Sequence, residues 1–393
     1  MVLVVALGLS GLLLAQPAGL SLPPRTWAFV AILAVVGALT VGATRPRPRH
    51  TVPVLAIAVV GSLAAYILLA APVEPETGAE AAGPASTPPA ISSAVPTPVA
   101  PRPPQRPILG ISTSTLDQLD RFVGATGTNP EVFDLFEPWS RNRPLDTSLV
   151  DSLAARGARL SITWEPWDPD GSHTRQPRYS LASIIAGKHD PYIDLFASSI
   201  GRLQGPVTIR LMHEMNGNWY PWAARLNGNR PGEFVRAWQH VHDRFAALGV
   251  TNVVWMWAPN AIYPGAAPLA PLYPGDAYVD AVGVSNYNWG DFRRQGVTTQ
   301  WATFGELFDE SISELRALSP RPVWIAEVGS SDNGGSKADW LAATLQEVAQ
   351  RPEITGLVWF DHVDEGVGVD WRIELDLRAA AAWRTGFMSR PPA

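Results

Sequence analysis

The chain has 393 residues, 16 tryptophans, no cysteine and a formal net charge of −6. A chain of this length allows one large domain with additional segments, and the lack of cysteine excludes disulfides, thiolate catalysis and cysteine-ligated zinc. Because the charge is spread without long runs of one sign, no basic stripe can neutralise the phosphates of a nucleic acid, and we expect no nucleic-acid partner.

Three apolar stretches come first, at about residues 1–22, 27–44 and 52–71. The third is uncharged and long enough to cross a bilayer, which takes roughly 20 residues of helix. The first could instead be the core of a signal peptide, although it lacks a positively charged start and an obvious cleavage site. We expect residues 1–72 to form a membrane anchor, with the lipid bilayer as a partner.

The orientation of this anchor follows from the loop before the third stretch, which carries Arg45, Arg47 and Arg49. Short loops rich in Lys and Arg stay in the cytoplasm, so the chain after residue 72 is expected to lie outside the cytoplasm, at the cell membrane. Residues 73–106 are rich in Pro and Ala. Proline lacks an N–H and fixes φ, which predicts an extended linker.

From Ile108 onward, short apolar runs typical of strands alternate with helical patterns. The expected strands are Ile108–Ser112, Val132–Phe136, Arg159–Thr163, Val207–Leu211, Val253–Trp257, Ala281–Ser285, Val323–Ala326 and Leu357–Phe360. Expected helices include Asp146–Arg156, Pro191–Leu203, Pro231–Leu248, Phe304–Leu318 and Lys337–Ala349. Eight alternations within residues 107–388 predict a (β/α)₈ TIM barrel, an α/β fold. The runner-up, a doubly wound sheet, usually has a Gly-rich phosphate loop after its first strand, and Gly110-Ile111-Ser112 is not one.

The residues that close the expected strands are polar and aromatic. They include Glu137, Trp164, His213-Glu214, Asn260, Tyr287, Glu327 and Trp359. In a barrel of this kind the active site lies at the carboxyl ends of the strands. Carboxylates, amides and flat aromatic faces gathered at one mouth are typical of a carbohydrate cleft.

Two of these residues, Glu214 and Glu327, close strands on opposite sides of the barrel. Hydrolysis of a glycosidic bond needs an acid for the leaving oxygen and a second carboxylate opposite it. A single glutamate at a strand end is more often a surface or ion-pair residue. Here, however, Glu327 follows a strongly apolar strand, where an unpaired carboxylate is costly unless it has a function.

The sequence also argues against a catalytic metal site and against a serine nucleophile. His213-Glu214 resembles the start of a zinc-protease motif, but Gly217 stands where the second His is needed. No Gly-x-Ser-x-Gly motif of serine hydrolases is present. We therefore expect no catalytic metal and no cofactor.

The segments Arg210–Trp222, Asp280–Tyr287 and Ile325–Gly329, with Asp370–Arg372, resemble glycoside hydrolase family 26. The resemblance covers about residues 108–375 and implies a retaining, metal-free, endo-acting mechanism on β-linked polysaccharide. By motif position Glu214 looks like the acid/base and Glu327 like the nucleophile. The resemblance further implies that His213 contacts a sugar hydroxyl, that Tyr287 hydrogen-bonds the nucleophile, and that Trp219 and Trp359 are stacking platforms, with Trp164 as a more loosely aligned sugar contact. Asn260, at the end of the fifth expected strand, is a further expected substrate-binding residue.

Substrate and reaction outcome stay open at this point. The family's commonest activity is endo-β-1,4-mannanase, but Ser285 and Phe360 stand where typical mannanases have an acidic residue and an arginine, which favours the mixed-linkage β-1,3-1,4-glucanase branch. The alternatives are a non-catalytic binder of surface glycan and a membrane-bound enzyme that trims or transglycosylates an exopolysaccharide.

Overall fold

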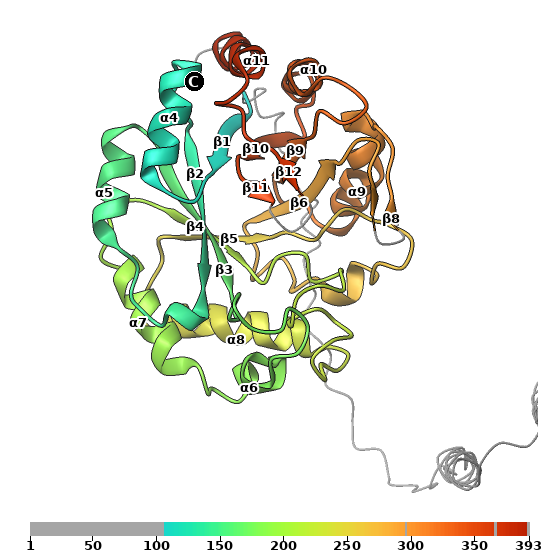
Figure 1. The fold of residues 1–393 in the computed structure, drawn as a ribbon. Coiled ribbons are helices and arrows are strands. Elements are labelled where there is room, and N and C mark those ends of the chain that lie inside the picture. Colours follow the sequence, from blue (N-terminus) through green and yellow to red (C-terminus); the bar gives the residue numbers. More distant parts are fainter. Residues whose placement is uncertain (1–105, 295–296, 365–367, 391–393) are drawn as a thin grey trace, which may run out of the picture. The chain divides into compact units, whose positions relative to one another are not determined.

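The computed structural model describes residues 106–294, 297–364 and 368–390, and their centre is a closed barrel of eight parallel strands (Figure 1). The strands are β1 (Ile108–Ser112), β2 (Val132–Pro138), β3 (Arg159–Glu165), β4 (Val207–Leu211), β5 (Val253–Trp257), β6 (Ala281–Asn288), β9 (Val323–Ser330) and β10 (Ile354–Phe360). Their order around the barrel is β1-β10-β9-β6-β5-β4-β3-β2. The predicted TIM barrel is confirmed.

Helices surround the strands (Figure 1). They are α4 (Leu116–Thr126), α5 (Thr147–Ala155), α6 (Leu181–Ile185), α7 (Asp190–Ile200), α8 (Glu233–Ala247), α9 (Phe304–Leu318), α10 (Lys337–Ala349) and α11 (Leu377–Met388). The helix starts are locally encoded. Asp146 caps α5 by accepting from Ser148 N at 3.0 Å, and Thr303 and Glu306 form a capping box at α9.

The structure differs from the expected elements in two respects. Several strands run further than their apolar runs, so that Glu165 ends β3 and Glu327 lies inside β9. Polar residues continue a strand when their backbone pairs with a neighbour, which composition does not reveal. Between β5 and β6, the 3₁₀ turn Ala270–Leu272 stands in place of a long helix.

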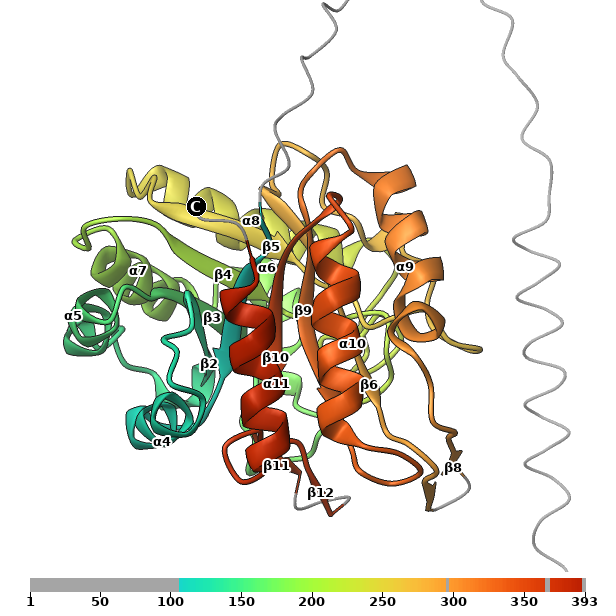
Figure 2. The ribbon, with the colours of Figure 1, turned by 90° about the horizontal axis from the view of Figure 1, so that it is seen from above.

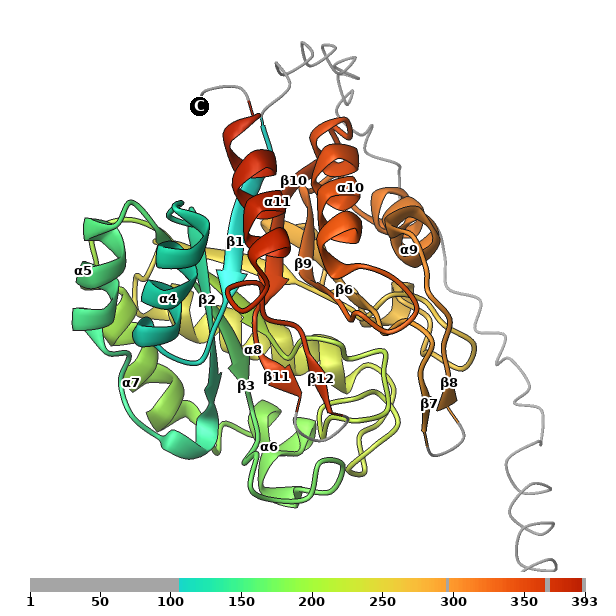
Figure 3. The same cartoon turned by 45° about the horizontal axis from the view of Figure 1, so that its top comes forward.

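Two hairpins extend the barrel at the carboxyl ends of the strands. The pair β7 (Arg293–Arg294) and β8 (Val297–Thr298) follows β6, and the pair β11 (Val363–Asp364) and β12 (Val369–Asp370) follows β10. Both hairpins lie at one end of the barrel (Figures 2 and 3). This end is where the sequence places the site.

Alternation along the strands separates an outer apolar layer from a polar interior. Ser161 and Thr163 of β3 donate to the carboxylate of Asp134 on β2, at 2.6 and 2.9 Å, so these three side chains face the barrel axis. Trp164, the residue after Thr163, has the opposite parity, faces outward and stacks on Phe196 of α7 with ring centroids 4.6 Å apart. This parity decides which residues at the strand ends reach the mouth.

The membrane anchor at 1–72 and most of the linker at 73–106 lie outside the described residues. Of the helices within the described ranges, none is both long and apolar enough to span a bilayer.

Two buried carboxyl groups, Asp361 and Glu374, flank the β11–β12 hairpin in sequence. Asp361 follows β10 and is fully buried, and Glu374 is 9% exposed. The Asp361 carboxylate accepts from Ile373 N at 2.7 Å, and its backbone carbonyl accepts from Gln118. Burial, and then the neighbouring Glu374, raises the pKa of Asp361 well above its ordinary value. The folded protein therefore binds a proton here more tightly than the unfolded chain does.

Because of this proton, Asp361→Asn should raise the Tm at pH values near 7. The stability that depends on the neutral carboxyl is fully present below the unfolded pKa and is lost as pH rises toward the raised folded pKa. An amide supplies the neutral form at every pH, and a gain of about 2–4 °C would correspond to ~1 kcal/mol. Thermal unfolding at pH 7 and at about pH 4, where the gain should shrink, measures it. Asp339→Asn on the surface of α10 is the control, and an equal or lower Tm for Asp361→Asn at pH 7 contradicts the prediction.

Candidate active site

Glu327 lies in the mouth of the barrel, on β9, and is 3% exposed. One carboxylate oxygen forms an ion pair with Arg210 of β4, and the other accepts a hydrogen bond from the hydroxyl of Tyr287 of β6. The Nε2 atom of His213 lies 4.0 Å from the same oxygen that faces Arg210. A cation and a hydroxyl donor both stabilise the ionised form of Glu327.

Glu214 is held in a different way, three residues beyond the end of β4. Its φ is +54°, and that of Met212 is +47°, values that are uncommon for side chains of this size. Each such residue costs about 1–3 kcal/mol, and such conformations cluster at functional sites. The bend is fixed by Glu214 N, which donates to Ala258 O at 2.8 Å. It turns the carboxyl group, 7% exposed, into the mouth.

Two neutral donors orient the Glu214 carboxylate. The indole N–H of Trp219 donates to one oxygen at 2.8 Å, and the amide of Asn260 donates to the other at 3.1 Å. A Cβ on Gly217 would lie 2.5 Å from the Trp219 ring, so only glycine leaves room for the indole to fold back over Glu214. Gly217, which stands where a zinc protease would have its second His, therefore gives the Trp219 indole room beside the Glu214 carboxylate.

The protonation of Glu214 follows from these surroundings. Burial, followed by the negative charge of Glu327, raises the pKa of Glu214 to about 7, against the smaller opposing effects of its hydrogen bonds and Arg210. Glu214 thus carries a proton at slightly acidic pH, while Glu327 is paired with a cation. Two carboxyl groups with such different surroundings are suited to acid and nucleophile roles.

His213 and Tyr220 form a neutral pair beside the carboxylates. The Nε2 atom of His213 lies 3.2 Å from the Tyr220 hydroxyl. Burial, followed by the charge of Arg210, holds the pKa of His213 well below its ordinary value, so the ring is neutral. Its buried Nδ1 has no hydrogen-bond partner among the described residues.

Arg210 connects the polar residues under the mouth. Its side chain is 1% exposed and donates to the Thr163 hydroxyl at 2.6 and 2.9 Å and to the Ser285 hydroxyl at 3.3 Å. Asp134 lies 3.7 Å away. Ser285, where the sequence comparison expects an acidic residue in mannanases, here accepts a hydrogen bond from Arg210.

A pocket of about 300 Å³ adjoins these groups, and aromatic rings form its wall. Phe360 packs edge-on against Phe136 and Tyr287, at 6.0 and 5.4 Å between ring centroids, and Phe136 contacts His213 at 5.8 Å. His362 lies on Phe360 at 4.3 Å and is hydrogen-bonded to the hydroxyls of Ser112 and Ser114. Burial lowers the pKa of His362 to about 4, so this wall is neutral at neutral pH.

A larger cavity, about 690 Å³, lies away from the carboxylates, between α4 and α5 on the outer side of β2. It shares Ser114, Leu135 and Arg141 with the pocket at the mouth. Neither Glu214 nor Glu327 lines either pocket, but the rings of the smaller one, Phe136 and Phe360, contact His213 and Tyr287 beside the carboxylates. We place the chemistry at the mouth, because the paired carboxyl groups are there.

Two expected sugar contacts are wrong. Trp359 is fully buried, and its indole N–H donates to Trp371 O at 2.9 Å. Trp164 is also fully buried and donates to the Tyr192 hydroxyl at 3.1 Å. Both face the outer layer of the barrel, because the residues next to them, Phe360 and Glu165, are the ones with the inward parity.

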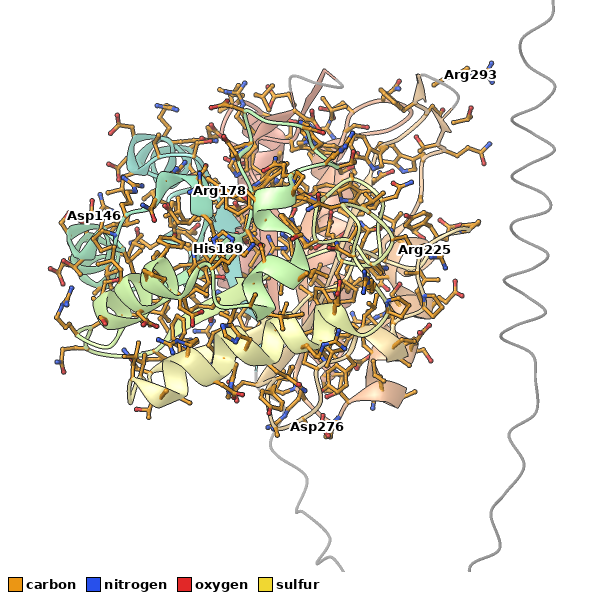
Figure 4. All side chains as sticks on the ribbon, turned by 90° about the horizontal axis from the view of Figure 1, so that it is seen from below. Asp146, Arg178, His189, Arg225, Asp276 and Arg293 are labelled. Atoms are coloured by element: carbon orange, nitrogen blue, oxygen red, sulfur yellow. The ribbon has the colours of Figure 1, made fainter. Side chains whose placement is uncertain are left out.

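Trp164 belongs to an aromatic cluster that fills the space between β3 and α7. Trp139 packs on it at 4.9 Å, and His189 packs on Trp139 at 5.4 Å. The His189 ring N–H donates to the backbone carbonyl of Arg178 at 2.9 Å, and the two residues lie close together in Figure 4. The cluster has a packing role.

The other expected residues, Glu214, Glu327, His213, Trp219, Tyr287 and Asn260, come together at the mouth. Sequence reasoning assigned no role to Arg210, Glu165 or Asp134. A charge inside an apolar strand was the available signal for Arg210, since such a charge is buried only with a partner. In the described residues, no group of three or more His, Cys, Asp or Glu side chains is arranged to hold a metal ion.

The sequence is similar to a known family model and to several characterised glycosidases. Residues 186–324 match the family model described as Glycosyl hydrolase family 26. The chain is 32% identical over 269 residues to Endoglucanase H of Acetivibrio thermocellus. The aligned region covers 67% of this chain and 28% of that protein. It is 27% identical over 277 residues to a mannan endo-1,4-beta-mannosidase of Bacillus subtilis, covering 63% of this chain and 71% of that protein.

Solved structures are similar in fold. The β-mannanase of Bacteroides ovatus, BoMan26A, has a TM-score of 0.55 at 18% identity and covers 72% of this chain and 89% of its own. The mannanase man26 of Bacillus subtilis has a TM-score of 0.53 at 17% identity, with coverages of 72% and 86%. This chain spans 28%, 42% and 55% of the first three curated relatives. The chain is thus similar to family 26 glycosidases in sequence and in fold.

Proposed function

We infer that the barrel is a glycosyl hydrolase of family 26, and we propose that it cuts β-linked polysaccharide internally with retention of configuration. The observation that carries the proposal is the pair of buried carboxyl groups with opposite surroundings: Glu327 paired with Arg210 and Tyr287, and Glu214 without a cation of its own. Glycoside hydrolysis uses one carboxylate and one carboxylic acid.

In the first step the Glu327 carboxylate attacks the anomeric carbon and forms a covalent glycosyl ester. The bond from that carbon to the leaving oxygen breaks, and Glu214 gives its proton to this oxygen. In the second step a water molecule attacks the same carbon, Glu214 takes a proton from it, and Glu327 leaves as a carboxylate. Tyr287 and Arg210 stabilise the charge on Glu327 before and after the two steps.

For the substrate, we propose a glucan-type backbone, with mixed-linkage β-1,3-1,4-glucan as the first choice. The neutral wall of Phe136, Phe360 and His362 beside the carboxylates supports a site that stacks on sugar rings and lacks an ionic contact there. The similarity to Endoglucanase H points the same way. β-1,4-Mannan is the second candidate, because the similar fold of BoMan26A and the match to the Bacillus subtilis mannosidase favour it.

The test is to incubate the purified protein with mixed-linkage β-glucan, galactomannan and xylan and to follow new reducing ends. Glu327→Ala is the matched control, and NMR of the first product reports its anomeric configuration. We expect release from one polymer, loss of release in the variant, and an initial product with the β configuration. A folded protein that releases nothing but retains one of the glycans would instead be a surface-glycan binder.

Two further parts of the proposal rest on the sequence alone. We propose that residues 1–72 anchor the enzyme in the cell membrane and that the barrel works outside the cytoplasm, where it could also trim or transglycosylate an exopolysaccharide. The apolar stretches and the Arg-rich loop support this arrangement. Protease added to intact cells should digest the barrel, and full protection of the barrel would contradict the proposal.

A further inference from the structure

A third carboxyl group, Glu165, faces the mouth from the end of β3. Ser161 and Thr163 on the same strand face inward, and Glu165 has their parity. Glu165 is 4% exposed, and the charged groups that act on its carboxyl group are those of Arg210, Glu327 and Asp134. It is therefore buried beside the nucleophile, and the two-carboxylate mechanism gives it no role.

The charges around it do not balance if every group is ionised. In the described part of the mouth, four carboxyl groups share the guanidinium of Arg210. Arg210 is an ion-pair partner of Glu327 and of Asp134. Glu214 and Glu165 have no cation left, and an uncompensated buried carboxylate is costly. The geometry alone thus favours a proton on both.

The local contacts of Glu165 differ from those of Glu214. Glu214 accepts from Trp219 and Asn260, two donors that tune it for proton transfer. Glu165 has the indole of Trp167 as its side-chain neighbour, and this indole N–H makes no well-aligned hydrogen bond among the described residues. An indole N–H can only donate, so Trp167 offers no acceptor to the O–H of a neutral Glu165, and a substrate oxygen can fill that place.

We propose that Glu165 binds the sugar unit beside Glu327 as a neutral carboxylic acid, donating its proton to one sugar hydroxyl and accepting from another. This role rests on the proposed function. It makes Glu165 a substrate-binding residue, because no bond to it forms or breaks. A carboxylic acid and a primary amide offer the same donor and acceptor pair, so glutamine can replace it, whereas a carboxylate cannot donate.

The electrostatics of the mouth agree with this state. Burial raises the pKa of Glu165 to about 8, and the charges of Glu327 and Asp134 raise it against the effects of Trp167 and Arg210. Tyr220, another titratable side chain near Glu165, keeps its proton because burial holds its pKa well above the ordinary value. Glu165 is thus neutral at pH 7 and ionises above about pH 8, where it loses its donor.

Two variants test the chemistry of this contact. Glu165→Gln should keep kcat/KM within about fivefold of wild type near pH 6, and Glu165→Ala should lower it by about 10- to 100-fold, mainly through KM. Equal damage in both variants would show that a carboxylate is required and would overturn the proposal. Unchanged kcat/KM in Glu165→Ala would overturn it as well.

The alkaline pH profile separates binding from a merely structural role. Wild type needs protons on both Glu214 and Glu165, so log(kcat/KM) against pH should steepen to a slope of about −2 above pH 8. Glu165→Gln needs one proton and should keep a slope of about −1. If wild type and Glu165→Gln show the same slope of log(kcat/KM) above pH 8, the assignment is overturned. A side chain with only a packing role would leave the number of protons required unchanged in the variant.

The control is Glu137→Gln, which makes the same chemical change at the end of β2 but outside the mouth, where Glu137 bonds to Arg141 and Arg143. It should leave the slope unchanged. Failure of the proposed function is a distinct result: wild type would then release no reducing ends from any of the three polysaccharides. An active wild type whose Glu165 variants behave like Glu137→Gln would overturn the inference alone.

Discussion

Replacing Glu214 with alanine should lower kcat/KM on the polysaccharide by about 10²- to 10⁴-fold, the range expected when a general acid is lost. A sugar leaving group needs a proton on its oxygen as the bond breaks. An aryl glycoside with an acidic phenol needs little help, so the loss of its glycosylation rate should be much smaller. The ratio of the two losses identifies the acid.

The pH dependence gives a second reading of the same variant. Glu214 acts in its protonated form, whose pKa is raised to about 7, so wild-type activity should fall as pH rises through 7. Glu214→Ala should lose this alkaline step on the aryl glycoside. Glu137→Gln is the control, since Glu137 lies outside the mouth. Equal losses on both substrates would contradict the assignment of Glu214.

Replacing Arg210 with methionine should cost about 3–5 kcal/mol in the free energy of unfolding, because it removes one partner of a buried ion pair and leaves the other charged. Arg210 is 1% exposed, and its partners Glu327 and Asp134 are 4% and 2% exposed at their side chains. Activity should fall too, since Glu327 would lose the cation with which it is paired. Urea unfolding at pH 7 measures the loss.

A double variant tests the cause. Adding Glu327→Gln to Arg210→Met removes the unpaired charge and should restore at least about 1 kcal/mol, which a double-mutant cycle resolves. Arg244→Met is the control: its ion pair with Asp194 is 34% and 31% exposed, and its loss should cost about 0–1 kcal/mol. If Arg210→Met unfolds like Arg244→Met, the buried pair does not stabilise the fold.

The barrel could be predicted because its strands are read from apolar runs, and helix starts such as Asp146 from a capping side chain. The candidate carboxylates could be predicted because parallel strands bring their carboxyl ends to one mouth. Glu214 and Glu327 come together there with Tyr287, His213, Trp219 and Asn260. Their chemical roles stay predictions until the variants are measured.

The rest depended on information that a strand's composition does not contain. Trp359 and Phe360 are adjacent aromatic residues, and only the pairing of β10 with its neighbours decides which one faces the mouth. Arg210 becomes meaningful only when β4 and β9 face each other across the barrel. The left-handed φ of Glu214 accompanies a hydrogen bond to Ala258, the residue that follows β5.

The seam that closes the barrel has a consequence for the order of synthesis. β1 pairs with β10, and Ser112 is hydrogen-bonded to His362, 250 residues later in the chain. A nascent chain therefore carries β1 with one edge unpaired until almost the whole domain has left the ribosome. Contacts so distant in sequence form slowly, and an open strand edge invites aggregation. A chain that is stopped before β10 has an open sheet and an incomplete mouth, so this fold is finished only after its last strand has left the ribosome.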